Sequence, residues 1–127
     1  MSVVYDTGAL VAAKRSAHRM WTRHVGLLSE EKISIVPAPV VAQAWRAGAR
    51  QANLARLLAG CRVEEMTDER AHAVGELLGA AGTADIVDGA VVECAGRLGA
   101  EAILSSDPED MRRLAQAAGW TGRVETV

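Results

Sequence analysis

The sequence is poor in several features that mark common classes of protein. It contains no Phe and only three Trp and one Tyr, so a surface that stacks successive bases of a single strand on aromatic rings is hard to build from it. Its formal net charge of −2 gives no overall attraction to a polyanion, so nucleic-acid binding must rest on a local patch or on metal ions. We find neither a signal peptide nor an apolar run of about 18 residues, and therefore expect no association with a membrane.

The chain has only two cysteines, and neither has the spacing of a metal or redox motif. Cys61 and Cys94 lie singly in apolar segments, so we expect buried, reduced thiols. Reduced thiols favour a cytoplasmic location. The three histidines also lack a metal-ligand spacing such as H-E-x-x-H, and we expect them on helix faces.

What the sequence does have is an abundance of small and aliphatic residues in alternating segments. At 127 residues it has the usual length of one domain, and we expect a single domain spanning residues 1–127. Short β-rich runs alternate with longer helical ones, which is typical of a parallel sheet covered on both faces. The sequence therefore predicts an α/β fold, a three-layer α/β/α sandwich with a central, mainly parallel sheet.

The pattern also predicts individual elements. The expected strands are residues 2–5, 33–36, 61–66, 102–104 and 123–127, the last of them an edge strand. Between them we expect helices that begin after capping residues, which are Ser16, Thr67, and either Thr83 or Asp85. A further helix is expected to follow Pro37 and Pro39.

Aspartates follow two of these strands and begin one helix. In an open parallel sheet, functional groups gather at the carboxyl ends of the strands, and VVYD and ILSSD end there at Asp6 and Asp107. Asp85 and Asp88 are three residues apart, which places both carboxylates near one face of a helix. We expect all four to line one cleft, where Mg²⁺ or Mn²⁺ would find the carboxylate oxygens that these ions prefer. Metal ions held in this way support hydrolysis of RNA phosphodiester bonds.

Each aspartate also has a purely structural interpretation. Asp6 and Asp85 are suited to capping the helices that follow them. Asp107 begins the motif D-P-E-D, in which a cap precedes Pro and two acids at the positive end of a helix. Asp88 lies deeper in an apolar helix, where an unpaired carboxylate is costly, and this favours a function for it.

We expect Trp21 and Trp45 to be structural, packing helices on the sheet or at a dimer contact.

Four blocks of the sequence together resemble a known family. In chain order they are VVYDTGALVA, PAPVVAQAWRAG, DIVDGAVVECA and ILSSDPEDMRRLA, and they resemble the successive blocks of a PIN domain of the VapC-like toxin type. The resemblance covers nearly the whole chain. It implies a metal-dependent endoribonuclease in which Asp6, Asp88 and Asp107 bind Mg²⁺ or Mn²⁺, with Asp85 as an extra acid. It also implies a homodimer held inactive by a small cognate antitoxin protein.

One position departs from the family pattern. The third-helix residue that is usually glutamate is Gln43 here, and a neutral amide keeps an oxygen ligand but removes a charge, which weakens metal affinity. This leaves open a PIN-like fold that has lost catalysis and serves as an RNA- or protein-binding module. A phosphoacceptor receiver domain is a further alternative, but it fits less well, because Tyr5-Asp6 supplies only one acid and no lysine follows Ile103.

Overall fold

The computed structural model describes residues 1–127, and its five strands form one parallel sheet in the order β3-β2-β1-β4-β5. The strands are β1 (Ser2–Tyr5), β2 (Ile33–Pro37), β3 (Cys61–Glu64), β4 (Ala102–Ser105) and β5 (Arg123–Thr126). The first strand is central, with Val4 opposite Ile35 on one side and Ile103 on the other. Val3, Val4 and Tyr5 of β1 are fully buried, which is typical of a parallel strand that is covered on both faces.

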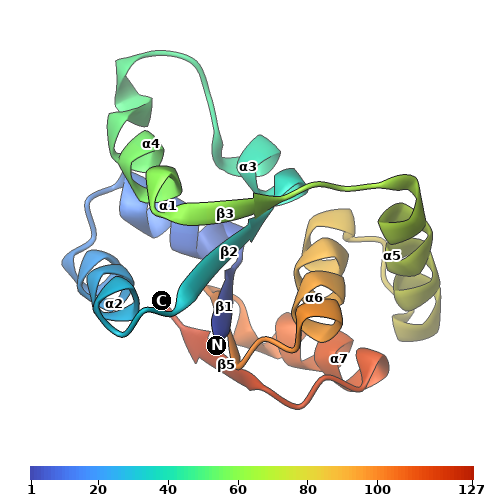
Figure 1. The fold of residues 1–127 in the computed structure, drawn as a ribbon. Coiled ribbons are helices and arrows are strands. Elements are labelled where there is room, and N and C mark those ends of the chain that lie inside the picture. The colour runs from blue at the N-terminus through green and yellow to red at the C-terminus, as the bar shows by residue number, and fades with distance from the viewer.

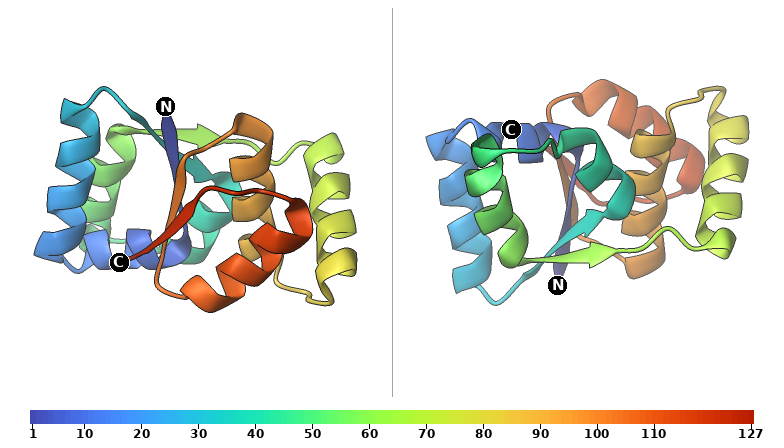
Figure 2. Two further views of the ribbon diagram at one scale, coloured as in Figure 1. Left: turned by 90° about the horizontal axis from the view of Figure 1, so that it is seen from below. Right: turned by 90° about the horizontal axis from the view of Figure 1, so that it is seen from above.

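Helices cover both faces of this sheet. They are α1 (Thr7–Lys14), α2 (His18–Ser29), α3 (Ala38–Ala44), α4 (Ala52–Ala59), α5 (Asp68–Ala81), α6 (Ile86–Leu98) and α7 (Pro108–Ala118), and the short 3₁₀ turn η1 (Ala49–Gln51) precedes α4. Helices α1, α2 and α4 lie on one side of the strands and α5, α6 and α7 on the other (Figures 1 and 2). The predicted three-layer α/β/α sandwich is therefore confirmed. None of the helices combines the length and the apolar character needed to cross a membrane.

The core is built from aliphatic side chains, as the lack of Phe requires. Leu10 of α1 and Ile103 of β4 are fully buried, and so is Val91 of α6. Burying a side chain of this size contributes about 1.5–3 kcal/mol relative to leaving it exposed. Helix α6 contacts β1, β2 and β4, so the helix that begins beside Asp85 and Asp88 is anchored against the middle of the sheet.

Most predicted helix starts are correct, and one is wrong. Thr67 caps α5 by accepting a hydrogen bond from the Arg70 backbone N–H at 3.2 Å, and Asp85, rather than Thr83, caps α6. Ser16 does not cap α2, because its φ of 61° places it in the left-handed region and its hydroxyl instead accepts from Asn53. The tight turn between α1 and α2 accounts for this difference.

The cysteines and two of the tryptophans differ in how far they are buried. Both cysteines are free thiols, and Cys94 is buried as expected, but Cys61 is only half-buried. Trp21 packs against the core, but Trp45 does not, and 40% of its surface is exposed. The chain leaves α3 at Trp45 in an extended conformation, so packing of Trp45 on the sheet is not confirmed, and its place at a dimer contact stays a prediction.

Candidate functional site

The carboxyl ends of β1 and β4 lie side by side at one edge of the sheet. These strands pair in parallel, with Tyr5 opposite Leu104, so the residues that follow them emerge at the same place. One pocket of about 520 Å³ opens there, and we call it the acidic pocket. Its lining includes every residue that the sequence singled out, namely Asp6, Gln43, Asp85, Asp88 and Asp107.

Asp6 is the most firmly held of these side chains. Only 5% of its surface is exposed. Its Oδ1 accepts a hydrogen bond from the backbone N–H of Thr7 at 2.7 Å, and its Oδ2 accepts one from the Ser105 hydroxyl at 2.8 Å. Asp6 thus caps α1 and faces the pocket at once, so the structural and functional interpretations of this residue do not compete.

Ser105 links two of the acidic segments. It is the last residue of β4 and is fully buried. Its hydroxyl donates to Asp6 and accepts a hydrogen bond from the backbone N–H of Asp107 at 3.0 Å. Sequence reasoning had no means of finding this role, because the pairing joins residues that lie 99 positions apart. The only signal was the pair of serines, Ser105 and Ser106, before the strand-end aspartate in ILSSD.

Gly8 allows α1 to approach the loop after β4. A Cβ atom at this position would lie 2.2 Å from the Ser106 Oγ and 2.8 Å from the Ser106 backbone nitrogen. Any other residue here would push the start of α1 away from that loop. Gly8 is therefore a second residue that shapes the pocket and that the sequence pattern did not reveal.

The remaining aspartates are held less firmly. Asp85 accepts a hydrogen bond from the Asp88 backbone N–H at 3.0 Å through its Oδ1, and so caps α6. Asp107 occupies the N-cap position of α7, but its side chain makes no capping hydrogen bond. The interpretation of Asp107 as only a helix cap therefore finds no support in its contacts.

The carboxylates raise one another's affinity for protons. Burial, together with the negative charges of Asp6 and Asp85, raises the pKa of Asp88 from its ordinary value of 3.8 to about 7. Burial is also the main reason why the pKa of Asp6 is raised. None of the four aspartates takes part in any of the nine ion pairs of the structure. The four carboxylates thus share the pocket with a single cation, Arg15, which forms an ion pair with none of them, so the pocket concentrates negative charge.

The donor set matches the chemistry of a hard divalent cation, which prefers carboxylate oxygens. No group of three or more His, Cys, Asp or Glu side chains is already arranged to hold a metal ion. The fit is therefore one of charge and ligand type, and the less firmly held acids, Asp88 and Asp107, would have to turn toward a common point. Metal binding by these residues and by Asp85 stays a prediction.

Gln43 lies on α3, at the wall of the acidic pocket. Its Oε1 accepts a hydrogen bond from the Thr7 hydroxyl at 2.5 Å. The one oxygen that this side chain could offer a cation is thus shared with α1. A carboxylate at this position would keep the bond to Thr7 and still have a second oxygen for a metal ion.

Comparison with known proteins gives a match in structure but none in sequence. No protein-family model and no curated protein sequence matches the chain. Among solved structures, it is similar to a chain in the crystal structure of VapBC2 from Rickettsia felis bound to a DNA fragment from their promoter. The two share 15% sequence identity with a TM-score of 0.73, and the match covers 100% of this chain and 99% of the other. An identity this low shows the fold alone.

Proposed function

Because the chain has the fold of a VapC-like PIN domain, we propose that it is a metal-dependent endoribonuclease that hydrolyses RNA phosphodiester bonds. One observation carries this proposal. Four aspartates from three separate segments of the chain line one pocket, and no Lys or Arg forms an ion pair with any of them. The charge of Asp6 is buried without a cationic partner, which is costly for a fold, and a divalent cation is the counter-charge that suits the oxygens of all four aspartates.

In this proposal, Asp6, Asp88 and Asp107 hold Mg²⁺ or Mn²⁺, and Asp85 is an additional acid at the same site. When bound, the metal supplies polarisation of a phosphoryl oxygen, activation of a water and stabilisation of the leaving oxyanion. Asp6 provides a fixed reference point, because Thr7 and Ser105 hold both of its oxygens. Asp88 and Asp107 would supply further carboxylate oxygens to the cation, and Gln43 would offer a neutral oxygen at the wall.

The proposed function includes partners for the chain. We expect a single PIN-like domain over residues 1–127 that acts in the cytoplasm as a homodimer and is the toxin of a VapBC-type system. A small antitoxin protein would inactivate it by placing a basic side chain in the acidic pocket, where a charge-assisted hydrogen bond to carboxylate is favourable. Support comes from the shared fold with VapBC2 and from the unbalanced charge of the pocket.

The test is an RNA cleavage assay on several structured RNAs, with Mg²⁺, with Mn²⁺ and with a chelator. Asp6→Asn and Asp107→Asn are each expected to lower cleavage by more than the roughly 10–100-fold cost of changing a residue that only supports a metal ligand. Asp68→Asn is the matched control, because its side chain is 95% exposed on α5. Cleavage that survives the chelator, or that is intact in both pocket variants, would contradict the proposal.

A second candidate function rests on Gln43. The absence of a charge at this wall, together with the lack of a ready-made metal cluster, favours an RNA- or protein-binding module that has lost catalysis. The two functions separate in the same assay. A module without catalysis would bind RNA but leave it intact at every metal concentration.

A further inference from the structure

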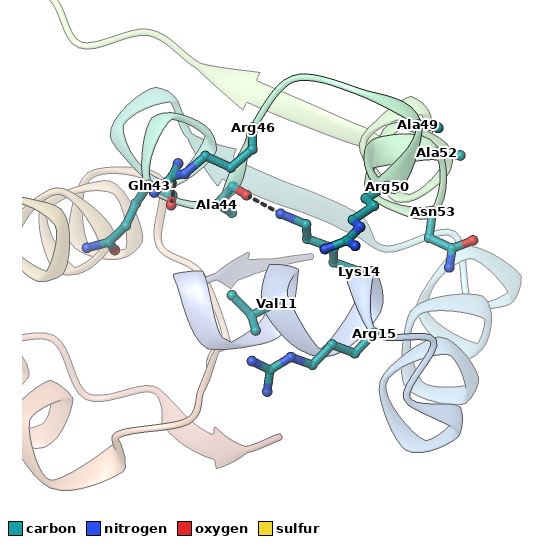
Figure 3. Close-up of a pocket in the computed structure, with 10 residues that line it drawn as sticks. All are labelled: Val11, Lys14, Arg15, Gln43, Ala44, Arg46, Ala49, Arg50, Ala52 and Asn53. Carbon is teal, nitrogen blue, oxygen red and sulfur yellow. Dashed lines mark hydrogen bonds between the residues drawn. The ribbon is translucent and has the colours of Figure 1, made fainter.

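A second pocket, of about 570 Å³, adjoins the acidic one and has the opposite charge. We call it the basic pocket, and Figure 3 shows its lining. The lining includes four cationic side chains and no acidic one; they are Lys14 and Arg15 from the end of α1, Arg46 from the loop after α3, and Arg50 from η1. Val11, Arg15 and Gln43 line both pockets, so the two are continuous.

This gathering of positive charge is not an effect of composition. The chain as a whole carries a formal charge of −2, and six of its 14 Lys and Arg residues are held in ion pairs. Half of the other eight line the basic pocket. Four unpaired cations around one hollow create a local positive potential that an acidic protein does not otherwise offer to a polyanion.

Two of the four cations also have a structural task. Lys14 donates a hydrogen bond from its Nζ to the carbonyl of Ala44 at 3.2 Å, as Figure 3 shows. Arg46 donates from one guanidinium nitrogen to the carbonyls of Gln43 and Trp45, at 3.2 and 2.6 Å. Both therefore stabilise the carboxyl end of α3, where exposed carbonyls favour positive charge.

The other two cations have no such task. Arg15 and Arg50 are exposed, and their side chains form neither an ion pair nor a hydrogen bond with the rest of the chain. In Figure 3, Arg50 extends from η1 toward Lys14 across the pocket, while Arg15 lies on the side that the acidic pocket shares. Their guanidinium groups keep all five N–H donors free, in the planar arrangement that matches a phosphate.

We propose that the basic pocket binds the phosphodiester backbone of an RNA strand next to the phosphate that is cleaved in the acidic pocket. This inference rests on the proposed function and adds where the substrate lies. The strand would pass over the end of α1, with Arg15 and Arg50 each binding a backbone phosphate and Lys14 and Arg46 adding positive charge. The lining offers four cations but no aromatic ring for stacking, so we expect its contacts to be mainly with backbone phosphates, which carry no sequence information.

The experiment measures binding separately from cleavage. Binding of a fluorescent single-stranded RNA oligonucleotide is followed by anisotropy in the presence of a chelator, at several salt concentrations, for wild type and for Arg15→Gln/Arg50→Gln. We expect the double variant to lose affinity on the order of tenfold. Its plot of log affinity against log salt should be less steep by about 1.4, since each phosphate contact on a single strand contributes about 0.7.

The matched control is Arg112→Gln/Arg113→Gln. It removes the same charge from exposed positions on α7 that are outside both pockets and form no ion pair. It should bind like wild type, and unfolding curves should show both double variants to be folded. An unlabelled DNA strand of equal length should compete well, because phosphate contacts do not read the 2′-hydroxyl.

Three results would overturn the inference. The first is an equal loss of RNA affinity in the two double variants, and the second is no loss of affinity in Arg15→Gln/Arg50→Gln. The third is competition by polyglutamate of matched charge that is as strong as competition by RNA, which would assign the pocket to an acidic peptide. Its failure is distinct from failure of the proposed function. If cleavage depends on Asp6 but is unaffected by Arg15→Gln/Arg50→Gln, only this inference fails. If RNA binds at the basic pocket but is not cleaved, only the proposed nuclease activity fails.

Discussion

The acidic and basic pockets adjoin one another, but the structure holds their charges in different ways. The acidic pocket is anchored by one buried side chain, because Asp6 follows a central strand and is hydrogen-bonded to Ser105 of the neighbouring strand. The basic pocket is lined by four long cationic side chains from a helix end and a loop, and all but Lys14 are exposed. Fixed short side chains suit a task that depends on geometry, and long flexible ones suit attraction of a chain whose position varies.

The two pockets also differ in how strongly their charges destabilise the folded protein. Negative charges in the acidic pocket oppose one another, and burial raises the pKa of both Asp6 and Asp88. The cations of the basic pocket are solvated, so their mutual repulsion is weakened by water and salt. The acidic pocket therefore carries the larger energetic conflict, and substitutions there should have the larger effects.

Outside the four aspartates, the largest effect is expected from Ser105→Ala, which removes the link between Asp6 and Asp107. The substitution leaves the Asp6 Oδ2 and the Asp107 N–H without their partner, which costs about 1–3 kcal/mol of unfolding free energy. We also expect metal affinity to fall roughly 10–100-fold, as it does when a group that orients a metal ligand is lost. Chemical denaturation and metal titration by calorimetry measure the two effects.

Ser106→Ala is the control for that experiment, because Ser106 is exposed and its hydroxyl forms no hydrogen bond within the chain. Its unfolding free energy should change by no more than about 0.5 kcal/mol. If Ser105→Ala lost stability but kept full metal affinity and cleavage, the idea that a fixed Asp6 matters for function would be wrong.

An intermediate effect is expected from pH. An acid whose pKa is raised in the folded state contributes stability that is complete below its unfolded pKa and is lost as pH rises through the folded value. With the pKa of Asp88 raised to about 7, the metal-free protein should resist denaturant less at pH 8 than at pH 5. Denaturation midpoints across this range measure the trend.

Two additions sharpen this pH experiment. Asp88→Asn should flatten the dependence on pH, and saturating Mg²⁺ or Mn²⁺ should oppose the loss at high pH, because an ion that binds only the folded state stabilises it. The account of charge repulsion would fail if the metal-free protein were equally stable at both pH values and Asp88→Asn left it unchanged.

The smallest effect is expected at the boundary of the two pockets. Gln43→Glu adds an anionic oxygen beside the acidic pocket and can still accept the hydrogen bond from Thr7, so metal affinity should rise several-fold. Cleavage should rise at limiting metal, and the gain should shrink at saturation. Metal titration and cleavage at matched occupancy are the measurements, with Gln116→Glu on α7 as the control for added charge. Unchanged affinity would mean that Gln43 takes no part in the site.

The sequence alone was enough to predict where the acids meet. Asp6 and Asp107 follow strands, and parallel strands end at the same edge of a sheet, so local patterns determine a contact between distant residues. The i, i+3 spacing of Asp85 and Asp88 likewise places them at one helix start, and Asp85 caps that helix as predicted. The structure agrees with this placement, while the metal-binding roles stay predictions.

The rest depended on tertiary contacts that no local pattern encodes. Ser105 matters because of a bond to Asp6, and Gly8 because of the loop that passes next to it. The prediction for Ser16 failed because a hydroxyl before a helix can cap it only if the turn allows, and here the turn is left-handed. The basic pocket was also missed, since α1 and η1 meet only in the folded chain.

The order of strands in the sheet has a consequence for how the protein is made. Strand β1 is synthesised first, yet one of its two neighbours, β4, is about 100 residues later in the chain, and the Ser105 partner of Asp6 comes with it. Closing so long a loop is slow, and a nascent chain folds from its N-terminus as it emerges. The acidic pocket can therefore assemble only after β4 has been synthesised, and a chain that ended before β4 would lack the Ser105 hydroxyl that holds Asp6 in place.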